Sequence, residues 1–236
     1  MKKSHIVMLL TFLLLIPATI YFGLRFSGRA YYVTSTLVMI ETLVPFLLAF
    51  ENRKPQAREL VVLAVMCALS VAGRVAIPIP SFKAIFGIIM IAGIAFGPES
   101  GFLVGAISAL AGNFFYSQGP YTPWQMMAYG AGGMLAGFVF AEGRLPRKPV
   151  VMGIFGFLAV TFFVGPLLDT CSVFLVMSRI SLQGAMAFYI SGFPVNLRQA
   201  VATAIVLLVL GKPLLEKLDR IKTKYGILDD EGRKEA

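Results

Sequence analysis

The chain has 236 residues, of which 58% are hydrophobic and only 14% are charged, and its mean hydropathy is +0.81. This composition lies well outside the usual range of soluble domains and predicts an integral membrane protein. The net charge of +9 would suggest a nucleic-acid partner in a soluble protein, but here the basic residues stand at the ends of apolar spans and act as topology signals. We expect no nucleic-acid partner. Apolar spans recur from residue 6 to residue 210 and leave no room for a soluble catalytic domain, so any ATPase is expected to be another chain.

Two apolar stretches in residues 1–57 are long enough to cross a bilayer, at residues 6–24 and 31–50. The first is too long for the apolar region of a typical signal peptide and no small-residue cleavage site follows it, so we expect a retained span. Glu41 lies near the centre of the second stretch, where an ionisable group is costly and marks a functional or partnered position. The simpler interpretation is a glutamate that is protonated or hydrogen-bonded between helices.

A polar segment at residues 51–58 separates this N-terminal extension from a module at residues 58–227. The module is predicted to contain six spans, at residues 59–77, 84–96, 100–116, 123–141, 150–177 and 197–210. The fifth exceeds the roughly 20 residues that cross a bilayer, so we expect it to be tilted or broken at Gly165-Pro166. The last continues as a basic amphipathic tail over residues 212–225, and residues 228–236 form a charged end.

The distribution of lysine and arginine predicts the topology of the chain. A cytoplasmic amino terminus gives eight spans with both ends inside and leaves most of the basic residues on the cytoplasmic side, as the positive-inside rule requires. This topology places three connections together on the outer side, at residues 78–83, 113–125 and 179–196.

The outer connection at residues 113–125 is the densest run of aromatic and amide side chains in the chain. Pro120 and Pro123 remove backbone donors and favour a helix break. Tyrosine and tryptophan rings collect at membrane–water boundaries, and amides both donate and accept hydrogen bonds. The pattern predicts a binding loop, with an ordinary interfacial turn as the alternative.

Polar side chains in the outer half of the membrane are the candidates for ligand contact, because a buried donor or acceptor needs a partner. Their mixture of amides, cations and aromatic rings suits a medium-sized organic solute better than a bare metal ion. The candidate substrate-binding residues are Arg74, Lys83, Asn113, Tyr116, Gln118, Tyr121, Trp124, Gln125 and Asn196. Asp169, Arg179, Gln183, Arg198 and Gln199 lie at similar predicted depth. The alternative for Arg74 and Arg179 is that they only anchor helix ends.

The sequence gives little support to the hypothesis that the chain is an enzyme or that it binds a metal ion. The only histidine is His5, at a span terminus, and Glu41 and Asp169 lie on separate spans. No glycine-rich phosphate-binding motif is present. We therefore expect no catalytic residue, no metal site and no catalytic cofactor. Cys67 and Cys171 fall within spans, which favours two small buried hydrophobic side chains over a disulfide.

Small residues form stripes on three of the predicted spans. Ala64, Ala68 and Ala72 recur every four residues and give a flat face on which another helix can dock, within the chain or in a partner. Similar stripes, assigned mainly to internal packing, are Gly101, Gly105, Ala109 and Gly112 on the third span of the module and Gly130, Gly133 and Gly137 on the fourth.

Several motifs are specific in combination. They are Ala64-x-x-x-Ala68, the turn at residues 78–82 before a short glycine-rich helix, Phe96-Gly-Pro-Glu99, the loop at residues 118–125, and the segment at residues 212–218 followed by Lys224-Tyr225-Gly226. With these motifs, residues 58–227 resemble the S-component, the substrate-binding membrane subunit, of an energy-coupling-factor vitamin transporter.

The resemblance implies an all-α, six-helix bundle in the bacterial cell membrane that captures a vitamin at its outer face. It also implies docking through Ala64 and Ala68 on a transmembrane coupling subunit that carries two cytoplasmic ATPases, and a toppling motion that delivers the ligand inside. The two spans in residues 1–57 depart from the usual module. Among family branches the chain looks most like the cobalamin type, with riboflavin or a queuosine precursor as alternatives. Outside the family, the alternatives are a self-contained transporter driven by an ion gradient through Glu41 or Asp169 and a membrane scaffold without a ligand.

Overall fold

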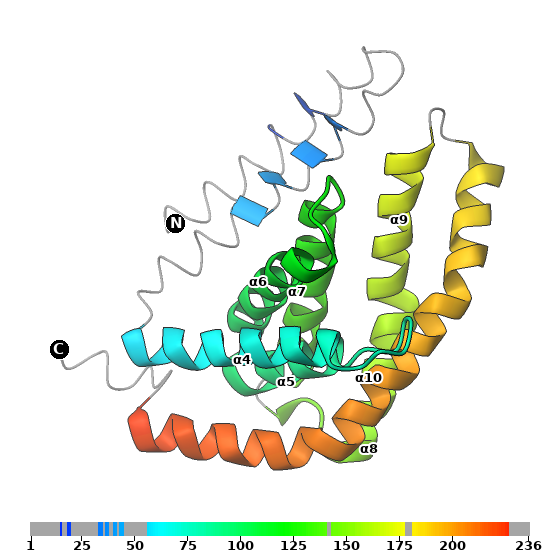
Figure 1. The fold of residues 1–236 in the computed structure, drawn as a ribbon. Coiled ribbons are helices and arrows are strands. Elements are labelled where there is room, and N and C mark those ends of the chain that lie inside the picture. Colours follow the sequence, from blue (N-terminus) through cyan, green and yellow to red (C-terminus); the bar gives the residue numbers. More distant parts are fainter. Residues whose placement is uncertain are drawn as a thin grey trace.

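A computed structural model of the chain describes residues 56–140, 143–177 and 181–226, with scattered positions between residues 15 and 44. All regular structure in these residues is helical, which confirms that the fold is all-α (Figure 1). Because α8, η3 and α9 form one continuous rod, the described module has six helices. The elements are α4 (Ala57–Val75), α5 (Ile85–Phe96), α6 (Pro98–Tyr116), α7 (Thr122–Phe140), α8 (Pro149–Ala159), η3 (Val160–Val164), α9 (Gly165–Val176) and α10 (Leu182–Tyr225). The predicted spans at residues 6–24 and 31–50 lie almost entirely outside the described residues, and the end at residues 228–236 lies wholly outside them.

The short helix α5 is the centre of the core. All 12 of its residues are buried, and it packs against α4, α6, α7 and α10. Its sequence contains no polar side chain, so every face of the helix can pack against apolar neighbours. The predicted span at residues 84–96 is thus confirmed within one residue.

Glycines bring α6 and α7 into close contact, and this pair makes the most extensive helix contact of the described residues. A Cβ atom at Gly101 would lie 2.7 Å from the carbonyl carbon of Gly133, and one at Gly105 would lie 2.7 Å from the nitrogen of Gly130. The assignment of these stripes to internal packing is confirmed. Because Gly, Ala and Ser replace larger apolar residues, α6 and α7 are less hydrophobic than ordinary spans. By length and composition, only Pro149–Val176 and Leu182–Tyr225 of the described helices qualify as candidate membrane spans.

The long fifth span of the module changes its helical pitch without ending. Its hydrogen bonding widens to the π pattern over Val160–Val164, where the amide of Gly165 donates to the carbonyl of Val160. Pro166 follows directly and has no amide hydrogen to donate. The predicted irregularity at Gly165-Pro166 is therefore present as a widened turn within a continuous helix.

The last helix is much longer than predicted. It begins at Leu182, where the Ser181 hydroxyl accepts a hydrogen bond from the Gly184 amide at 3.2 Å, and it ends before Gly226, whose φ is 58°. The prediction that residues 179–196 form an irregular outer connection is wrong for residues 182–196, and Arg179 lies outside the described residues. Pro194 lies within this helix, since a proline inside a membrane helix removes one hydrogen bond and need not end the helix. Figure 1 shows the first part of α10 running antiparallel to α9 before the helix bends.

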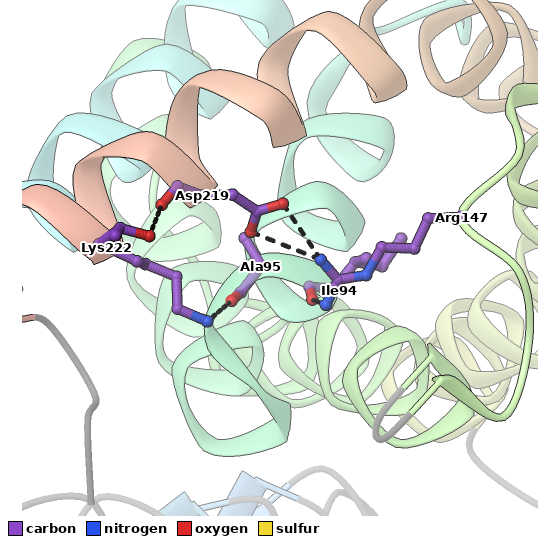
Figure 2. A network of polar contacts seen from close by, with 6 residues as sticks. Ile94, Ala95, Arg147, Asp219 and Lys222 are labelled. Carbon is purple, nitrogen blue, oxygen red and sulfur yellow. Dashed lines mark hydrogen bonds and ion pairs between the residues drawn. The ribbon is translucent and has the colours of Figure 1, made fainter. Parts of the chain in front are cut away.

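Two basic side chains close the carboxyl-terminal end of α5 (Figure 2). Arg147 donates to the carbonyl of Ile94 at 3.1 Å, and Lys222 donates to the carbonyl of Ala95 at 2.8 Å. Asp219 lies 3.4 Å from Arg147 and holds it against α10. The last carbonyls of a helix lack intrahelical donors and favour cations, so these contacts satisfy the end of the most buried helix. We call Arg147, Asp219 and Lys222 the inner clasp, because the predicted topology places them on the cytoplasmic side.

The inner clasp predicts a stability difference between two lysines of α10. Lys222→Met keeps the aliphatic stem but removes the donor to Ala95, and we expect a loss of about 1 kcal/mol in the free energy of unfolding. Lys217→Met, at an exposed position of the same helix, is the matched control and should change little. Thermal unfolding of the two variants in detergent measures the difference. Equal midpoints would show that the clasp contributes nothing to stability.

Candidate functional site

Asn113, at the end of α6, is the hub of a polar network that joins three helices. Its side chain is completely buried, and its carbonyl oxygen accepts a hydrogen bond from Arg74 of α4 at 3.0 Å. Its amide nitrogen lies 2.8 Å from the Gln125 side-chain oxygen and 3.1 Å from the Thr122 hydroxyl, both on α7. Asn113 thus uses both ends of its amide to hold the helices together.

The connection between α6 and α7 is tied to this hub through Thr122. The Thr122 hydroxyl donates to the Gln118 side chain at 2.9 Å and accepts from the Gly119 amide at 3.2 Å. Gln118 also donates to the carbonyl of Leu110 at 2.9 Å, and the Tyr121 hydroxyl donates to the carbonyl of Ser117 at 2.8 Å. Only residues 117–121 are outside helices, so the predicted binding loop at residues 113–125 is mostly the ends of α6 and α7.

The Arg74 guanidinium is enclosed by aromatic rings as well as by Asn113. Its central carbon lies 4.8 Å from the centroid of the Tyr116 ring and 5.9 Å from that of Tyr129. The Tyr116 hydroxyl donates to the Arg74 carbonyl at 3.0 Å. Lys83 lies 6.0 Å from the same Tyr116 ring, and its ammonium donates to the carbonyl of Ile77. These cation–π and hydrogen-bond contacts fix the outer end of α4 against α6.

Trp124 points away from the hub toward α9. Its ring stacks on Phe174 with a centroid separation of 5.7 Å and an interplanar angle of 24°. The side chain is only 6% exposed, and its indole N–H has no hydrogen-bond partner among the described residues. A buried donor without a partner is rare enough to need an explanation, and a ligand acceptor is one.

A second polar pair joins the outer parts of α9 and α10. The Asn196 amide donates to the Asp169 carboxylate at 2.7 Å, and the Thr170 and Tyr189 hydroxyls lie 2.8 Å apart. One turn further along α10, Gln199 donates to the carbonyl of Lys83 at 2.7 Å. The outer polar residues therefore form two groups, one on α4, α6 and α7 and the other on α9 and α10.

The structure separates the nine candidate ligand residues by their surroundings. Arg74, Asn113, Tyr116, Gln118 and Gln125 belong to the hub network, with Lys83 and Tyr121 at its rim. Trp124 and Asn196 lie outside the network, toward α9 and α10. Sequence reasoning missed Thr122, Tyr129 and Phe174, because a threonine or an aromatic residue in an apolar helix has no signal that separates it from packing residues.

Glu41 is hydrogen-bonded, as the simpler interpretation predicts. Its Oε1 atom accepts from the Thr19 hydroxyl at 2.6 Å, while Oε2 is buried without a partner among the described residues. Cys67 and Cys171 are free and buried, which confirms that they form no disulfide.

The alanine stripe of α4 faces outward. Ala64, Ala68 and Ala72 are exposed, and they line an apolar groove of about 640 Å³ between α4 and α6. The remaining walls are larger apolar side chains such as Leu63, Ile107 and Phe115. The groove combines small residues with an apolar rim, as a helix-docking surface in a membrane requires.

Comparison with known proteins identifies the family. Residues 54–216 match the family described as ECF-type riboflavin transporter, S component. The match covers well over half of the chain, so the chain belongs to this family of membrane transport subunits. S components partner in general with a T component and two ATPases, and the family is not one of enzymes. No curated protein and no solved structure matches the chain.

The saturated hub predicts that Asn113 contributes strongly to stability. Asn113→Leu removes three hydrogen bonds and leaves the polar groups of Arg74 and Gln125 without their partner, so we expect a loss of at least about 2 kcal/mol. Tyr121→Phe removes one hydroxyl contact at the rim and is the control, with an expected change below about 0.5 kcal/mol. Thermal unfolding in detergent compares them. An Asn113→Leu variant as stable as the control would contradict the structural role of the hub.

Proposed function

We propose that this chain is the substrate-capture subunit of an ECF transporter and that its ligand is riboflavin. The observation that carries the proposal is the family match over residues 54–216, which names riboflavin. In this proposal the chain binds the vitamin at its outer side, and ATP hydrolysed by partner chains drives delivery across the membrane, with both chain ends in the cytoplasm.

The outer residues supply chemistry that suits a flavin. The isoalloxazine ring of riboflavin is planar and stacks on aromatic side chains, and Trp124 and Phe174 already form such a stack with each other. One edge of that ring carries carbonyl oxygens and ring nitrogens, which can accept from the unpartnered indole N–H of Trp124. The amide of Gln125 lies in the first turn of the same helix, that of Gln118 lies in the connection before it, and both can complete the polar contacts.

Cobalamin, the ligand expected from the sequence resemblance, has less support than riboflavin. The family match names a riboflavin transporter, and an aromatic pair suits a flat ring system better than a corrinoid, whose ring carries side chains on both faces. Cobalamin, cobinamide and a queuosine precursor are therefore retained as competitors in the binding test.

The groove on α4 is the proposed contact with the T component. Alanines at positions 64, 68 and 72 allow a partner helix to approach the backbone of α4 closely, and the apolar walls of the groove exclude polar partners. Docking at this face leaves the outer polar residues free to hold the ligand.

Riboflavin binding to the purified chain is the direct test of the ligand. Trp124 is the only tryptophan, so its fluorescence reports on the stack with Phe174, and we expect riboflavin to quench it with saturation. Trp124→Ala should weaken binding at least tenfold, measured by calorimetry, because stacking and a hydrogen bond are both lost. Phe138→Ala, an exposed ring at the other end of α7, is the control. Saturable binding of cobalamin without binding of riboflavin would replace the proposed ligand.

Docking on the T component is tested by replacing an alanine of the α4 stripe with a larger side chain. Ala68→Trp fills the groove on α4 and should abolish riboflavin uptake by the reconstituted complex while the purified variant still binds riboflavin normally. Val65→Trp places the same ring at an exposed position of α4 outside the groove and should preserve uptake. Normal uptake by Ala68→Trp would rule out this groove as the contact. Uptake by the chain alone, without ATPase partners, would instead favour an ion-driven transporter.

A further inference from the structure

We propose that Asp169 is a specificity-determining residue of the ligand site and that its carboxylate accepts hydrogen bonds from the hydroxyl groups of the ribityl chain of riboflavin. The inference rests on the proposed function, and it assigns a part of the ligand to a residue that lies outside the hub network and that the family description gives no role.

The carboxylate of Asp169 accepts fewer hydrogen bonds within the described residues than a carboxylate can accept. Its Oδ2 atom accepts from the Asn196 amide at 2.7 Å, and neither a second donor nor a cation contacts the carboxylate among the described residues. An ionised carboxylate can accept about four hydrogen bonds. A carboxylate within a membrane helix is costly and is retained where it has a functional partner. Asp169 is half-buried, so it is not sealed from an incoming ligand.

The facing helix is built to leave room for this carboxylate. A Cβ atom at Gly192 of α10 would lie 2.6 Å from the Asp169 carboxyl carbon, so a side chain at Gly192 would displace the group. A simple tie between α9 and α10 needs no charge, because two amides could make the same hydrogen bond. Glycine at position 192 leaves space for a side chain of this size at position 169, and the charge on Asp169 is more than the tie between the helices requires.

Hydroxyl groups are the ligand groups that we expect to donate hydrogen bonds to Asp169. Val176 and Ile190 are both more than two-thirds exposed on α9 and α10, and the Thr170 hydroxyl, next to Asp169 in sequence, is already paired with Tyr189. A polyol chain brings its own donors to an acceptor-only carboxylate, and hydrogen bonds to a charged group are the stronger kind. An apolar substituent would leave the carboxylate desolvated and unpaired.

The spacing along α9 suits a ligand that stacks at one end and carries a polyol at the other. Phe174 lies five residues after Asp169, which corresponds to about 7.5 Å along the helix axis and about 140° around it, so Phe174 faces Trp124 of α7 while Asp169 faces α10. A flavin stacked beside Trp124 would lie across α9, with its ribityl chain extending toward Asp169 and α10. Trp124 and Asp169 would then recognise different parts of one molecule.

A comparison of two flavins tests the assignment. Lumiflavin has the ring system of riboflavin but no ribityl chain. Asp169→Asn keeps the shape of the side chain and an oxygen that can accept from Asn196, so it removes the charge without breaking the tie between the helices. We expect this variant to bind riboflavin about tenfold or more weakly and to bind lumiflavin within about twofold of the unmodified chain.

Two further variants separate recognition from structure. Asp219→Asn makes the same substitution in the inner clasp and should leave both affinities unchanged. Thr170→Val loosens the contact with Tyr189 and should affect both flavins equally, if it affects either. An unchanged affinity of Asp169→Asn for riboflavin, or an equal loss for both flavins, would overturn the assignment of Asp169. If the unmodified chain binds no riboflavin at all, the proposed function fails, and the assignment of Asp169 fails with it.

Discussion

The burial of α5 is the constraint on which the rest of the structure depends. A helix without polar side chains can pack in the centre of the bundle on every face, but the polar groups of its backbone ends must find partners elsewhere. At its inner end the partners are Arg147 and Lys222. At its outer end, the amide of Ala84 donates to the carbonyl of Gly73, and the carbonyl of Lys83 accepts from Gln199. The hydrogen bonds to the two backbone ends of α5 thus hold α4, the segment before α8 and both halves of α10 against this one short helix.

The polar residues on the predicted outer side are of two kinds. The hub residues around Asn113 form a structural frame, and other residues keep polar atoms that are available to a ligand. Asn113 and Thr122 use their hydrogen-bonding groups within the protein, so they stabilise this face and have few donors or acceptors left for a ligand. Trp124 and Asp169 differ, since each retains a polar atom without a partner among the described residues. Binding energy comes from groups that folding has not already satisfied. This distinction favours a ligand that lies toward α9 and α10, next to the frame.

Sequence patterns predicted the parts of the fold that local chemistry determines. Gly97-Pro98 separates α5 from α6, and the bounds of α5, α6 and α7 agree with prediction within about two residues. The start of α10 was predicted 15 residues too late, at residue 197 instead of Leu182, although Pro194 is accommodated within the helix. The outer polar residues were found, but not their roles. Arg74 and Asn113 are 39 positions apart, and no local pattern shows that they are paired while the indole of Trp124 is not.

One rigid helix connects the outer face with the docking groove. Ala72 faces the groove from the exposed side of α4, while Arg74, two residues later, is held by Asn113 and by the rings of Tyr116 and Tyr129. Cation–π contacts and a hydrogen bond to a fully buried amide leave the outer end of α4 little freedom to move against α6 and α7. A partner bound to α4 is therefore also connected to α6 and α7 through these contacts. If the T component binds this groove, as proposed, this attachment suits delivery of a ligand by reorientation of the whole subunit better than delivery by sliding one helix past another.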